Sequence, residues 1–594
     1  MASGLFFPHR RKANSSSSSP SRRDELIWRS VFLLLGITAI MGVCTFRLVQ
    51  LQILEGQLNH ERSEQNRVRP IPLSADRGNI VDRKGQLIAA NRLSRGVYLW
   101  PRQQSPQQWQ TTAFRLQQIL EIPAEEIIDR LAQTGYDSPL PVRISQQITP
   151  EAFVALAEYA PQLPGVEVFA GSTRLYPHRT LAAHVIGYIG EASEADMNAN
   201  PLYPNGMIVG QMGIERLANE LLQGKWGQRL VEVDAKGQEI RLLGMEAATG
   251  GETVELTLDL EMQRTAEQAL GGRRGAVAAI DVNTGAVLVL ASSPSFDPSI
   301  FTGRVSEAQW QQLQQGDYPF LNRALQGYPP GSTFKIVTSA AGIESGRFSP
   351  HSILSTSAFI TLGNHQFWEH SRQGYGAIGF REALAYSSNT FFYQIGLSIG
   401  PEEISKWGQR MGIGTTILGL EGEGSGIIPT PDEKEELYGE PWYGGDTVST
   451  SIGQGLVQAT PLELAVMVAS IANGGYRVQP HLMTQQTNTP ETQPEATGLS
   501  PETIAAIRSG LVAAVQQGTA QGLNDGSIPL TAGKTGTSEV VGPQPHALFV
   551  GFGPVDAPQI AIAVIVENGG FGGVTAIPVA HEVYKAFFGV RSEE

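Results

Sequence analysis

The sequence predicts an α+β protein whose largest domain is built on an antiparallel β-sheet. Residues 276–290 contain two apolar runs around Asn283-Thr284-Gly285, and residues 548–566 contain two more around a turn region with two prolines. Apolar runs on either side of turn-forming residues predict β-hairpins. Between the two hairpins the hydrophobic spacing is mainly helical, as in residues 462–472. Strands at both ends of a segment with helices between them are typical of an α+β domain with an antiparallel sheet.

The N-terminus predicts a basic tail followed by a single transmembrane helix. Residues 31–46 form an uncharged, mostly apolar run near the lower limit for a membrane-spanning helix, and Arg29 and Arg47 flank it. No A-x-A-like cleavage site follows, which favours an uncleaved signal anchor over residues 26–50 over a cleaved signal peptide or a buried helix. Residues 1–25 are basic and include a serine run, which predicts a disordered cytoplasmic tail, with the remaining chain outside the membrane.

Residues 51–250 predict a folded domain that precedes the antiparallel sheet. They mix short strand-like and helix-like pieces, with helical spacing in residues 127–131 and 150–156. An Ala-Ala-Thr-Gly-Gly stretch within residues 247–252 interrupts the pattern, so the last domain is expected over residues 251–590. Two polar segments of that last domain are predicted to be exposed loops, residues 422–439 and 485–497.

Composition excludes several classes of function. The formal net charge of −14 argues against a nucleic-acid-binding protein. The single cysteine, Cys44, lies inside the membrane run, so the rest of the chain can form neither a disulfide nor a cysteine-cluster zinc site. No H-E-x-x-H zinc motif occurs either. We therefore expect a core that is stable without disulfides, and neither a cofactor nor a metal.

Three short motifs occur in order in the last domain, namely Ser332-Thr333-Phe334-Lys335, Ser387-Ser388-Asn389 and Lys534-Thr535-Gly536. Each motif alone is a weak signal, because helix starts, helix caps and turns produce the same strings. Their order and context strengthen them, since Tyr328-Pro329-Pro330-Gly331 precedes the first and Gly453-Gln454-Gly455 lies between the second and the third. Together they form the S-x-x-K, S-x-N and K-T-G set of serine enzymes that acylate on penicillin and on D-Ala-D-Ala peptides.

With these motifs the chain resembles the class B penicillin-binding proteins, the monofunctional transpeptidases of bacterial cell-wall synthesis. Three upstream stretches resemble the family's N-terminal boxes: residues 77–85, residues 174–177 with 184–190, and residues 213–215. The resemblance extends over about residues 68–585. It implies a five-stranded catalytic sheet with helices on both sides, and a pedestal or dimerisation-type domain over residues 51–250, for which the residues alone leave a plain spacer equally open.

The first motif supplies a nucleophile and a candidate base. Gly331 precedes Ser332 and an apolar helical pattern follows, which places Ser332 near a helix N-terminus, where free N–H groups favour negative charge. Lys335 lies three residues further on and shares a helix face with Ser332. A serine hydroxyl needs a base to become a good nucleophile, and Lys335 is a base only when neutral. Burial and a second cation, Lys534, are expected to lower its pKa from about 10.4 to roughly 7.

The second motif supplies proton transfer and positioning. The Ser387 hydroxyl is expected to relay a proton to the leaving amine, and the Asn389 amide to hold a substrate carbonyl or Lys335. Some elongation-type relatives carry zinc ligands just before this motif, including a cysteine at its middle position. Here that position is Ser388, which argues against such a zinc site.

The third motif predicts the substrate-docking strand. Lys534-Thr535-Gly536-Thr537 is expected to form an edge strand to which a peptide or β-lactam adds by β-augmentation, because glycine allows another backbone to approach closely. Lys534 and Thr535 are expected to bind the terminal carboxylate. The backbone N–H groups of Thr537 and Ser332 are expected to form the oxyanion hole.

The leading hypothesis is a penicillin-sensitive D,D-transpeptidase anchored in the bacterial plasma membrane, acting on peptidoglycan stem peptides. Residues 165–168, 231–237 and 442–446 resemble the elongation type more than the division type, which remains the alternative. No glycosyltransferase-like segment is present, which implies a SEDS-family glycan polymerase and other elongation-complex membrane proteins as partners. A β-lactamase or D,D-carboxypeptidase is disfavoured by the anchor and the large N-terminal part, and a non-catalytic β-lactam sensor by the short tail.

Overall fold

A computed structural model describes residues 22–57, 67–138, 141–200, 203, 206–234, 239–303, 305, 307–415, 418–540, 542 and 544–589. Residues 1–21 of the predicted disordered tail, and residues 235–237 of the elongation-type stretch 231–237, lie outside the described part. The chain divides into two compact units. The first comprises Met1–Ile71 and Gln228–Met245, and the second comprises Pro72–Gly227 and Glu246–Glu594.

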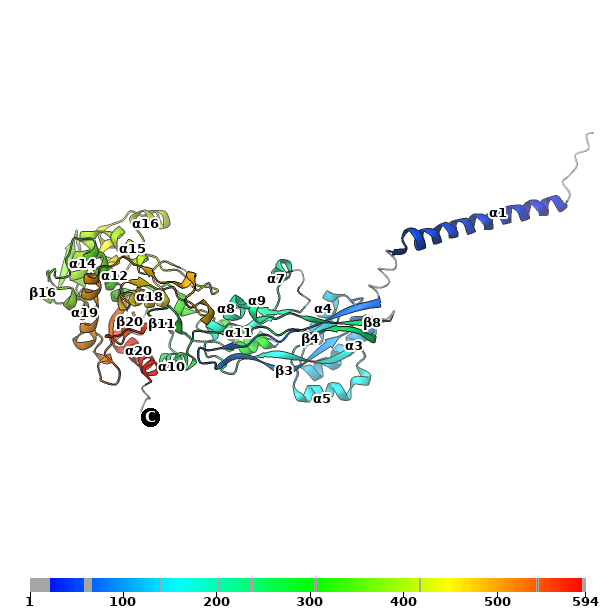
Figure 1. Cartoon of the computed structure of the whole chain (residues 1–594), viewed down its shortest axis with the longest axis horizontal. Helices are drawn as coiled ribbons and strands as arrows, with labels where there is room; N and C mark the ends of the chain where they lie inside the picture. The colour runs from blue at the N-terminus through cyan, green and yellow to red at the C-terminus, as the bar shows by residue number, and fades with distance from the viewer. Residues whose placement is uncertain are drawn as a thin grey trace, which may run out of the picture. The chain divides into compact units, whose positions relative to one another are not determined.

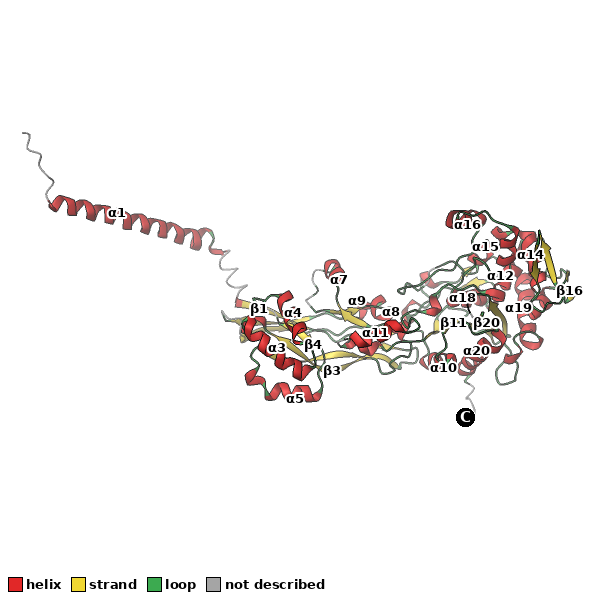
Figure 2. Ribbon diagram, turned by 180° about the vertical axis from the view of Figure 1, so that it is seen from behind, coloured by secondary structure: helices red, strands yellow, loops and turns green. Residues whose placement is uncertain are grey.

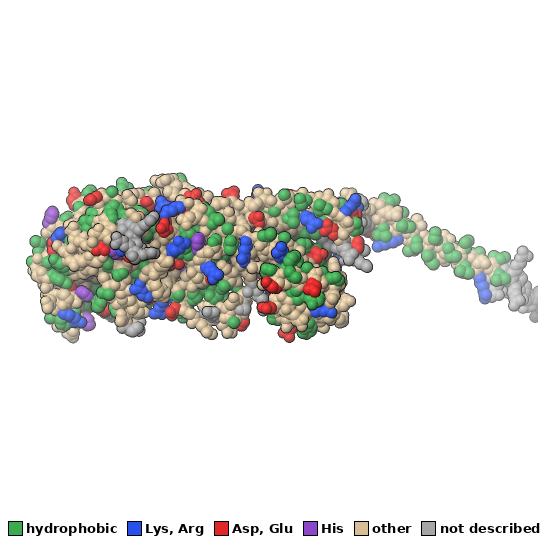
Figure 3. All heavy atoms as spheres, turned by 90° about the horizontal axis from the view of Figure 1, so that it is seen from below, with side chains coloured by type: hydrophobic (Ala, Val, Ile, Leu, Met, Phe, Trp, Pro, Cys, Tyr) green, Lys and Arg blue, Asp and Glu red, His purple; other side chains and the backbone are tan. Residues whose placement is uncertain are grey.

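The first unit begins with a long apolar helix. Helix α1 (Arg22–Val49) continues into a π-helical turn, Gln50–Leu54, and contains the predicted apolar run. The helical stretch Leu26–Leu54 is long and apolar enough to cross a membrane, and its apolar window is not buried within the described chain. In Figure 3 hydrophobic side chains cover this helix, with basic side chains near its ends. The rest of the unit includes strands β8 (Gly227–Val233) and β9 (Glu239–Glu246), in a sheet of order β1-β8-β9 with β1 (Val68–Leu73).

The N-terminal part of the second unit is a sheet flanked by helices. Its longest strands, β3 (Leu87–Leu99) and β5 (Val166–Leu175), pair antiparallel over ten residue pairs. Helices α3, α4 and α5 lie beside the part of β3 that pairs with β4, and they bury Trp109, Leu116 and Ile127 against it (Figure 2). The elements of this part are β2 (Ile80–Val81), β4 (Val142–Ser145), β6 (Ile189–Glu191), β7 (Ile208–Gly210), β10 (Val254–Glu255), α3 (Pro106–Leu120), α4 (Ala124–Thr134), α5 (Pro150–Glu158), α6 (Ala183–Ile186), α7 (Glu194–Ala199), α8 (Gly213–Leu217) and α9 (Asn219–Leu222).

The three upstream boxes meet at one buried carboxylate. Glu215, fully buried, accepts Nε of Arg77 at 2.5 Å and Nε of Arg174 at 2.6 Å, and it accepts the Tyr176 hydroxyl at 3.2 Å. Burial by itself raises the pKa of Glu215, but the two guanidinium groups lower it by more, so the carboxylate stays charged. Segments that lie 41 and 138 residues from Glu215 in the chain are therefore fastened by charge-assisted hydrogen bonds.

The C-terminal part of the second unit confirms the predicted antiparallel sheet. Its strand order is β12-β11-β21-β20-β19, and all neighbouring strands are antiparallel. The predicted hairpins are β11 (Gly275–Asp281) with β12 (Val287–Ser293) and β20 (His546–Gly553) with β21 (Ile560–Val566). Strand β19 (Ala532–Ser538) carries the third motif and forms an edge of the sheet, as predicted.

Helices cover both faces of this sheet, which explains why the apolar runs of β11, β12, β20 and β21 do not alternate with polar residues. Ala276, Ala278 and Ile280 of β11 belong to a core shared with α12 and α18, whereas Val277 and Ala279 belong to a core shared with α10 and α20. In Figure 1 α18 lies on one side of β11 and β20, and α10 and α20 lie on the other. Period-two alternation of the strand therefore buries both sets of side chains.

Helices and short strands fill the chain between the two hairpins. The helices of this C-terminal part are α10 (Leu260–Leu270), α11 (Glu307–Gln315), α12 (Lys335–Glu344), α13 (Phe380–Tyr386), α14 (Asn389–Ile399), α15 (Pro401–Arg410), α16 (Pro431–Tyr438), α17 (Gly444–Thr450), α18 (Pro461–Ala472), α19 (Pro501–Gln517) and α20 (Gly572–Phe588). The remaining strands are β13 (Leu354–Thr356), β14 (Phe359–Leu362), β15 (His365–Trp368), β16 (Gly376–Ile378), β17 (Tyr476–Arg477) and β18 (Glu495–Ala496).

The prediction of an exposed loop over residues 422–439 was wrong in its second half, where α16 forms. Thr430 caps this helix, because its hydroxyl accepts N–H of Glu433 while the Glu433 carboxylate accepts N–H of Thr430. Pro431 occupies the first helical position, where its missing N–H costs nothing. The proline and glutamates taken as loop residues are thus a capping box at a helix start. The other predicted loop, residues 485–497, contains strand β18 and two short 3₁₀ turns.

Candidate active site

The first motif forms a tight turn that leads into a buried helix. Gly331–Phe334 is a 3₁₀ turn, and α12 begins at Lys335, so Ser332 lies at a helix start as predicted. Ser332 is partly exposed, while the other three residues of the turn are buried. Gly331 has a φ of +53°, and a Cβ there would lie 2.6 Å from the carbonyl oxygen of Thr537. This turn therefore rests directly against β19, the strand of the third motif.

Lys335 is fully buried and is hydrogen-bonded to the second motif. Its Nζ donates to Asn389 Oδ1 at 2.7 Å, to the carbonyl of Ser387 at 2.7 Å and to the Ser387 hydroxyl at 3.2 Å. Burial lowers the pKa of Lys335 to about 7, against the attraction of the Glu369 carboxylate, which raises it. An amine with this pKa is partly neutral near pH 7, which is the state that can take a proton.

The second motif is the junction of two helices. Ser387 ends α13 in the left-handed conformation, with a φ of +62°, and Ser388 caps α14, which starts at Asn389. A serine in this region of φ/ψ space is uncommon and is held here by its surroundings. The junction brings the Ser387 hydroxyl and the Asn389 amide to the same ammonium group of Lys335.

The third motif places a second buried lysine next to the first. Lys534 Nζ donates to the carbonyl of Thr535 at 3.0 Å. Burial, and next the positive charge of Lys335, lower the pKa of Lys534 well below its ordinary value. The expected influence of one lysine on the other is thus seen on Lys534, whereas for Lys335 burial is the cause that lowers the pKa.

Glycines allow close packing between β19 and the Gly331–Phe334 turn, which carries the nucleophile and is called the nucleophile turn below. A Cβ at Gly536 would lie 2.9 Å from Cγ2 of Thr333 and 3.1 Å from the carbonyl oxygen of Pro330. The close backbone approach predicted at Gly536 is therefore made by the chain's own Pro330–Thr333 turn. The contact brings the turn that carries Ser332 alongside Thr537. The backbone N–H groups of these two residues were expected to form the oxyanion hole.

Residues outside the three motifs brace this arrangement. Gly453 accepts N–H of Gly331 at 2.8 Å, and the Gln454 side chain donates to the carbonyl of Thr537 at 3.3 Å. The Gly453-Gln454-Gly455 stretch noted in the sequence thus connects the first motif to the third. The Thr535 hydroxyl donates to the hydroxyl of Thr519 at 2.6 Å, a contact with no signal in the sequence because Thr519 belongs to no motif.

Ser388, the middle residue of the second motif, is committed to a carboxylate. Its hydroxyl donates to Oε2 of Glu369 at 2.7 Å. Both oxygens of Glu369 accept hydrogen bonds from the protein, and within the described ranges no group of three or more His, Cys, Asp or Glu side chains has the geometry to hold a metal ion. These residues therefore do not fit the zinc site that the resemblance attributes to some relatives.

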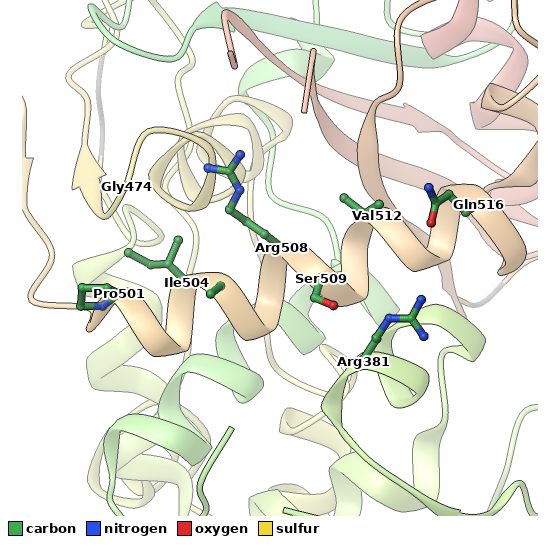
Figure 4. A pocket seen from close by; sticks show the side chains of 9 residues that line it. Arg381, Gly474, Pro501, Ile504, Arg508, Ser509, Val512 and Gln516 are labelled. Carbon is green, nitrogen blue, oxygen red and sulfur yellow. The ribbon is translucent and has the colours of Figure 1, made fainter. Parts of the chain in front are cut away.

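A solvent-open hollow in the C-terminal part is separate from this site. It has a volume of about 700 Å³ and is open to solvent between α13 and α19, with Arg381, Ile504, Arg508, Val512 and Gln516 among its lining residues (Figure 4). Arg508 is already used within the protein, because it donates to the carbonyls of Ala472 and Val555. No residue of the three motifs lines this hollow.

Comparison with known proteins agrees with this geometry. The family model "Penicillin binding protein transpeptidase domain" matches residues 275–585, and "Penicillin-binding Protein dimerisation domain" matches residues 72–256. The chain is 33% identical to Peptidoglycan D,D-transpeptidase MrdA of Acinetobacter baumannii, over 93% of this chain and 87% of that protein. A complex between penicillin-binding protein PBP2 and MreC from Helicobacter pylori contains a chain with a TM-score of 0.80 and 29% identity, covering 88% of this chain and 100% of that one. A structure described as "Structural coordination of polymerization and crosslinking by a peptidoglycan synthase complex" contains a chain with a TM-score of 0.71 and 31% identity, covering 95% and 99%.

The three motifs, brought together at the edge of the antiparallel sheet, are those of the penicillin-sensitive serine acyltransferases, and the family model and the relatives place this chain in that class. The chain belongs to the class B penicillin-binding proteins, among the elongation-type D,D-transpeptidases.

Proposed function

We propose that this transpeptidase cross-links peptidoglycan stem peptides through an ester on Ser332, with release of D-Ala. The observation that carries the proposal is the buried Lys335 ammonium, hydrogen-bonded to Ser387 and Asn389 one helical turn from Ser332. A buried lysine with a pKa of about 7 is suited to accept the hydroxyl proton, which an ordinary lysine is not.

Acylation proceeds through a tetrahedral intermediate, with Lys335 and Ser387 transferring the proton. Ser332 Oγ attacks the penultimate D-Ala carbonyl while Lys335 takes the hydroxyl proton. The negative oxygen of the tetrahedral intermediate accepts the backbone N–H groups of Ser332 and Thr537, an arrangement that typically contributes 10²–10³ in rate. As the C–N bond breaks, Ser387 passes a proton from Lys335 to the leaving amine, and D-Ala departs.

Substrate binding and deacylation use the third motif. The donor peptide lies as an added strand along the free edge of β19, and its terminal carboxylate binds Lys534 and Thr535. Asn389 holds a substrate carbonyl or Lys335. In the second half-reaction an amine of a neighbouring stem peptide attacks the ester carbonyl. The bond to Ser332 Oγ breaks, the oxygen regains a proton through Lys335, and a new peptide bond joins the two stems.

The nucleophile is tested by covalent labelling. Fluorescent penicillin is expected to label the wild-type protein and the Ser345→Ala variant, and not Ser332→Ala. Ser345 is the matched control because it caps the far end of α12, where its hydroxyl donates to the carbonyl of Gly342 and accepts N–H of Arg347. Equal labelling of Ser332→Ala rules out this nucleophile. Release of the bound penicillin within seconds contradicts the transpeptidase assignment, because a β-lactamase turns its adduct over.

The domain organisation that we propose with this function is the one predicted from the sequence. Residues 1–25 are a cytoplasmic tail, residues 26–50 a signal anchor in the plasma membrane, residues 51–250 a pedestal, and residues 251–590 the transpeptidase domain on the outer side. The proposal is supported by the apolar helix Leu26–Leu54 and by the two family models, which match 72–256 and 275–585.

A glycan polymerase of the SEDS family and other elongation-complex membrane proteins are the proposed partners. Support comes from structural relatives described with MreC and within a peptidoglycan synthase complex. A cross-linking assay with lipid-linked precursor tests the partnership. Cross-linked product is expected only when polymerase and the wild-type chain are combined, and not with Ser332→Ala. Depletion in cells is expected to cause loss of rod shape, whereas filamentation contradicts an elongation role.

A further inference from the structure

Glu369 is a buried carboxylate with an unusual number of hydrogen-bond donors. It follows strand β15 and is 1% exposed. Its Oε1 accepts N–H of Asn389 at 2.6 Å and of His370 at 3.0 Å. Its Oε2 accepts the Ser388 hydroxyl at 2.7 Å, the Thr390 hydroxyl at 2.8 Å and N–H of Thr390 at 3.0 Å. Five hydrogen bonds therefore satisfy both oxygens of this buried side chain.

Most of these donors belong to the junction that carries the second motif. Three residues of that junction, Ser388, Asn389 and Thr390, supply four of the five hydrogen bonds, at the start of the 11-residue helix α14. The carboxylate therefore sits where free N–H groups and the helix dipole both favour a negative charge. It fixes the backbone of Asn389, whose side chain accepts from Lys335.

Glu369 also acts on Lys335 through space. Its negative charge raises the pKa of Lys335 and so opposes the effect of burial. Lys335 also interacts electrostatically with Lys534 of β19 and with His370. Glu369 interacts in the same way with His370 and with Tyr393 of α14. Among these groups Glu369 is the acidic residue that acts on Lys335.

We propose that Glu369 is a positioning residue of the transpeptidase, which clamps the Ser387–Asn389 junction and sets the proton affinity of Lys335. The inference rests on the proposed role of Lys335 as the base. Glu369 touches neither the nucleophile nor the β19 strand in the described chain. It acts through Ser388 and Asn389, and both oxygens of its charged carboxylate are held by hydrogen bonds from the protein itself.

The test compares Glu369→Gln with Glu463→Gln in the full-length protein. Glu463 is a matched control because it is also 1% exposed and accepts several backbone N–H groups, from Gly414, Thr415, Gly426 and Thr460, without acting on Lys335. Two quantities are measured between pH 5 and pH 10: the rate of acylation by fluorescent penicillin, and the rate of acetylation of Lys335 by acetic anhydride, read by peptide mass spectrometry.

Removal of the negative charge is expected to disfavour the ammonium form of Lys335. In Glu369→Gln the midpoint of Lys335 acetylation therefore moves to lower pH by about one unit, and the acid limb of acylation moves with it. The maximal acylation rate falls about tenfold or more, because the junction loses its clamp. In Glu463→Gln both midpoints stay at the wild-type pH.

Two further variants keep the test decisive if Glu369→Gln folds poorly. Glu369→Asp keeps the charge, so the Lys335 midpoint stays within a few tenths of a pH unit of wild type while the acylation rate falls. Ser388→Ala removes one donor and lowers the rate without moving the Lys335 midpoint to lower pH. An unchanged midpoint in Glu369→Gln, or an equal shift in Glu463→Gln, overturns the inference. A shifted Lys335 midpoint with an unshifted acylation limb supports Glu369 and instead contradicts Lys335 as the base.

Discussion

Lys335 is a buried lysine whose surroundings make the ammonium ion less favourable than it is in water. Burial removes water from the charge, and the partners that replace the water are an amide oxygen, a hydroxyl and a carbonyl, none of them charged. The spacing of Ser332 and Lys335 predicted a shared helix face, and burial of Lys335 was expected from the chemistry. The partners were predictable in kind, because the second motif supplies them, but Glu369 was not.

The depressed pKa of Lys335 predicts a stability that rises with pH. The folded state binds this proton with a pKa of about 7 and the unfolded state with one of about 10.5, so the unfolded state holds more protons between these values. Stability from this group is therefore smallest below about pH 7 and increases by about 1.4 kcal/mol per pH unit above it. The unfolding temperature of the wild type is expected to rise more between pH 7 and pH 9 than that of Lys335→Met. Parallel curves for the two proteins contradict this pKa.

At the scale of elements, the site depends on how closely the nucleophile turn rests on β19. Gly331 and Gly536 allow that contact from its two sides, and Gly453 and Gln454 hold it with hydrogen bonds. The sequence indicated Gly536 as a place of close backbone approach, and Gly331 only as the residue before a helix start. It did not indicate that the two close approaches are to each other's segments, because the segments lie about 200 residues apart.

Gly331→Ala is expected to reduce acylation by fluorescent penicillin at least tenfold. The new Cβ lies 2.6 Å from the Thr537 carbonyl oxygen, so the turn and β19 must separate, and with them the two proposed oxyanion donors. Gly346→Ala is the matched control, since Gly346 also has a positive φ, of +73°, but a Cβ there meets no atom within 4 Å. Both variants incur the backbone penalty of about 1 kcal/mol for a positive φ, and only Gly331→Ala also introduces a clash with β19. Equal acylation rates in the two variants contradict the argument.

At the scale of the whole molecule, the three upstream boxes serve one buried ionic cluster. Arg77, Arg174 and Glu215 come from separate stretches, and each side chain is buried. The three charges stabilise one another, and removal of any one leaves a buried charge without a partner, since each charge has lost its water. The three upstream boxes, which contain none of the three catalytic motifs, therefore share a structural role.

Glu215→Gln is expected to destabilise the pedestal part by about 3–5 kcal/mol, because two buried guanidinium groups lose their counter-charge. The measurement is thermal unfolding of the full-length protein in detergent. Glu239→Gln is the control, since its ion pair with Arg229 is exposed and is expected to contribute less than about 1 kcal/mol. A Glu215→Gln variant as stable as Glu239→Gln contradicts a structural role for the cluster.

The sequence by itself determined the apolar helix, the two hairpins, the edge strand and the three motifs, because local spacing and short strings carry those features. It mistook the start of α16 for a loop, since proline and glutamate occur at helix starts as well as in loops. Only the tertiary structure decided that Glu369 clamps the second motif, that Gln454 reaches β19 and that three distant boxes meet at Glu215. Each of these contacts joins segments far apart in the chain, and a carboxylate or amide shows in the sequence no sign of which distant donor it will meet.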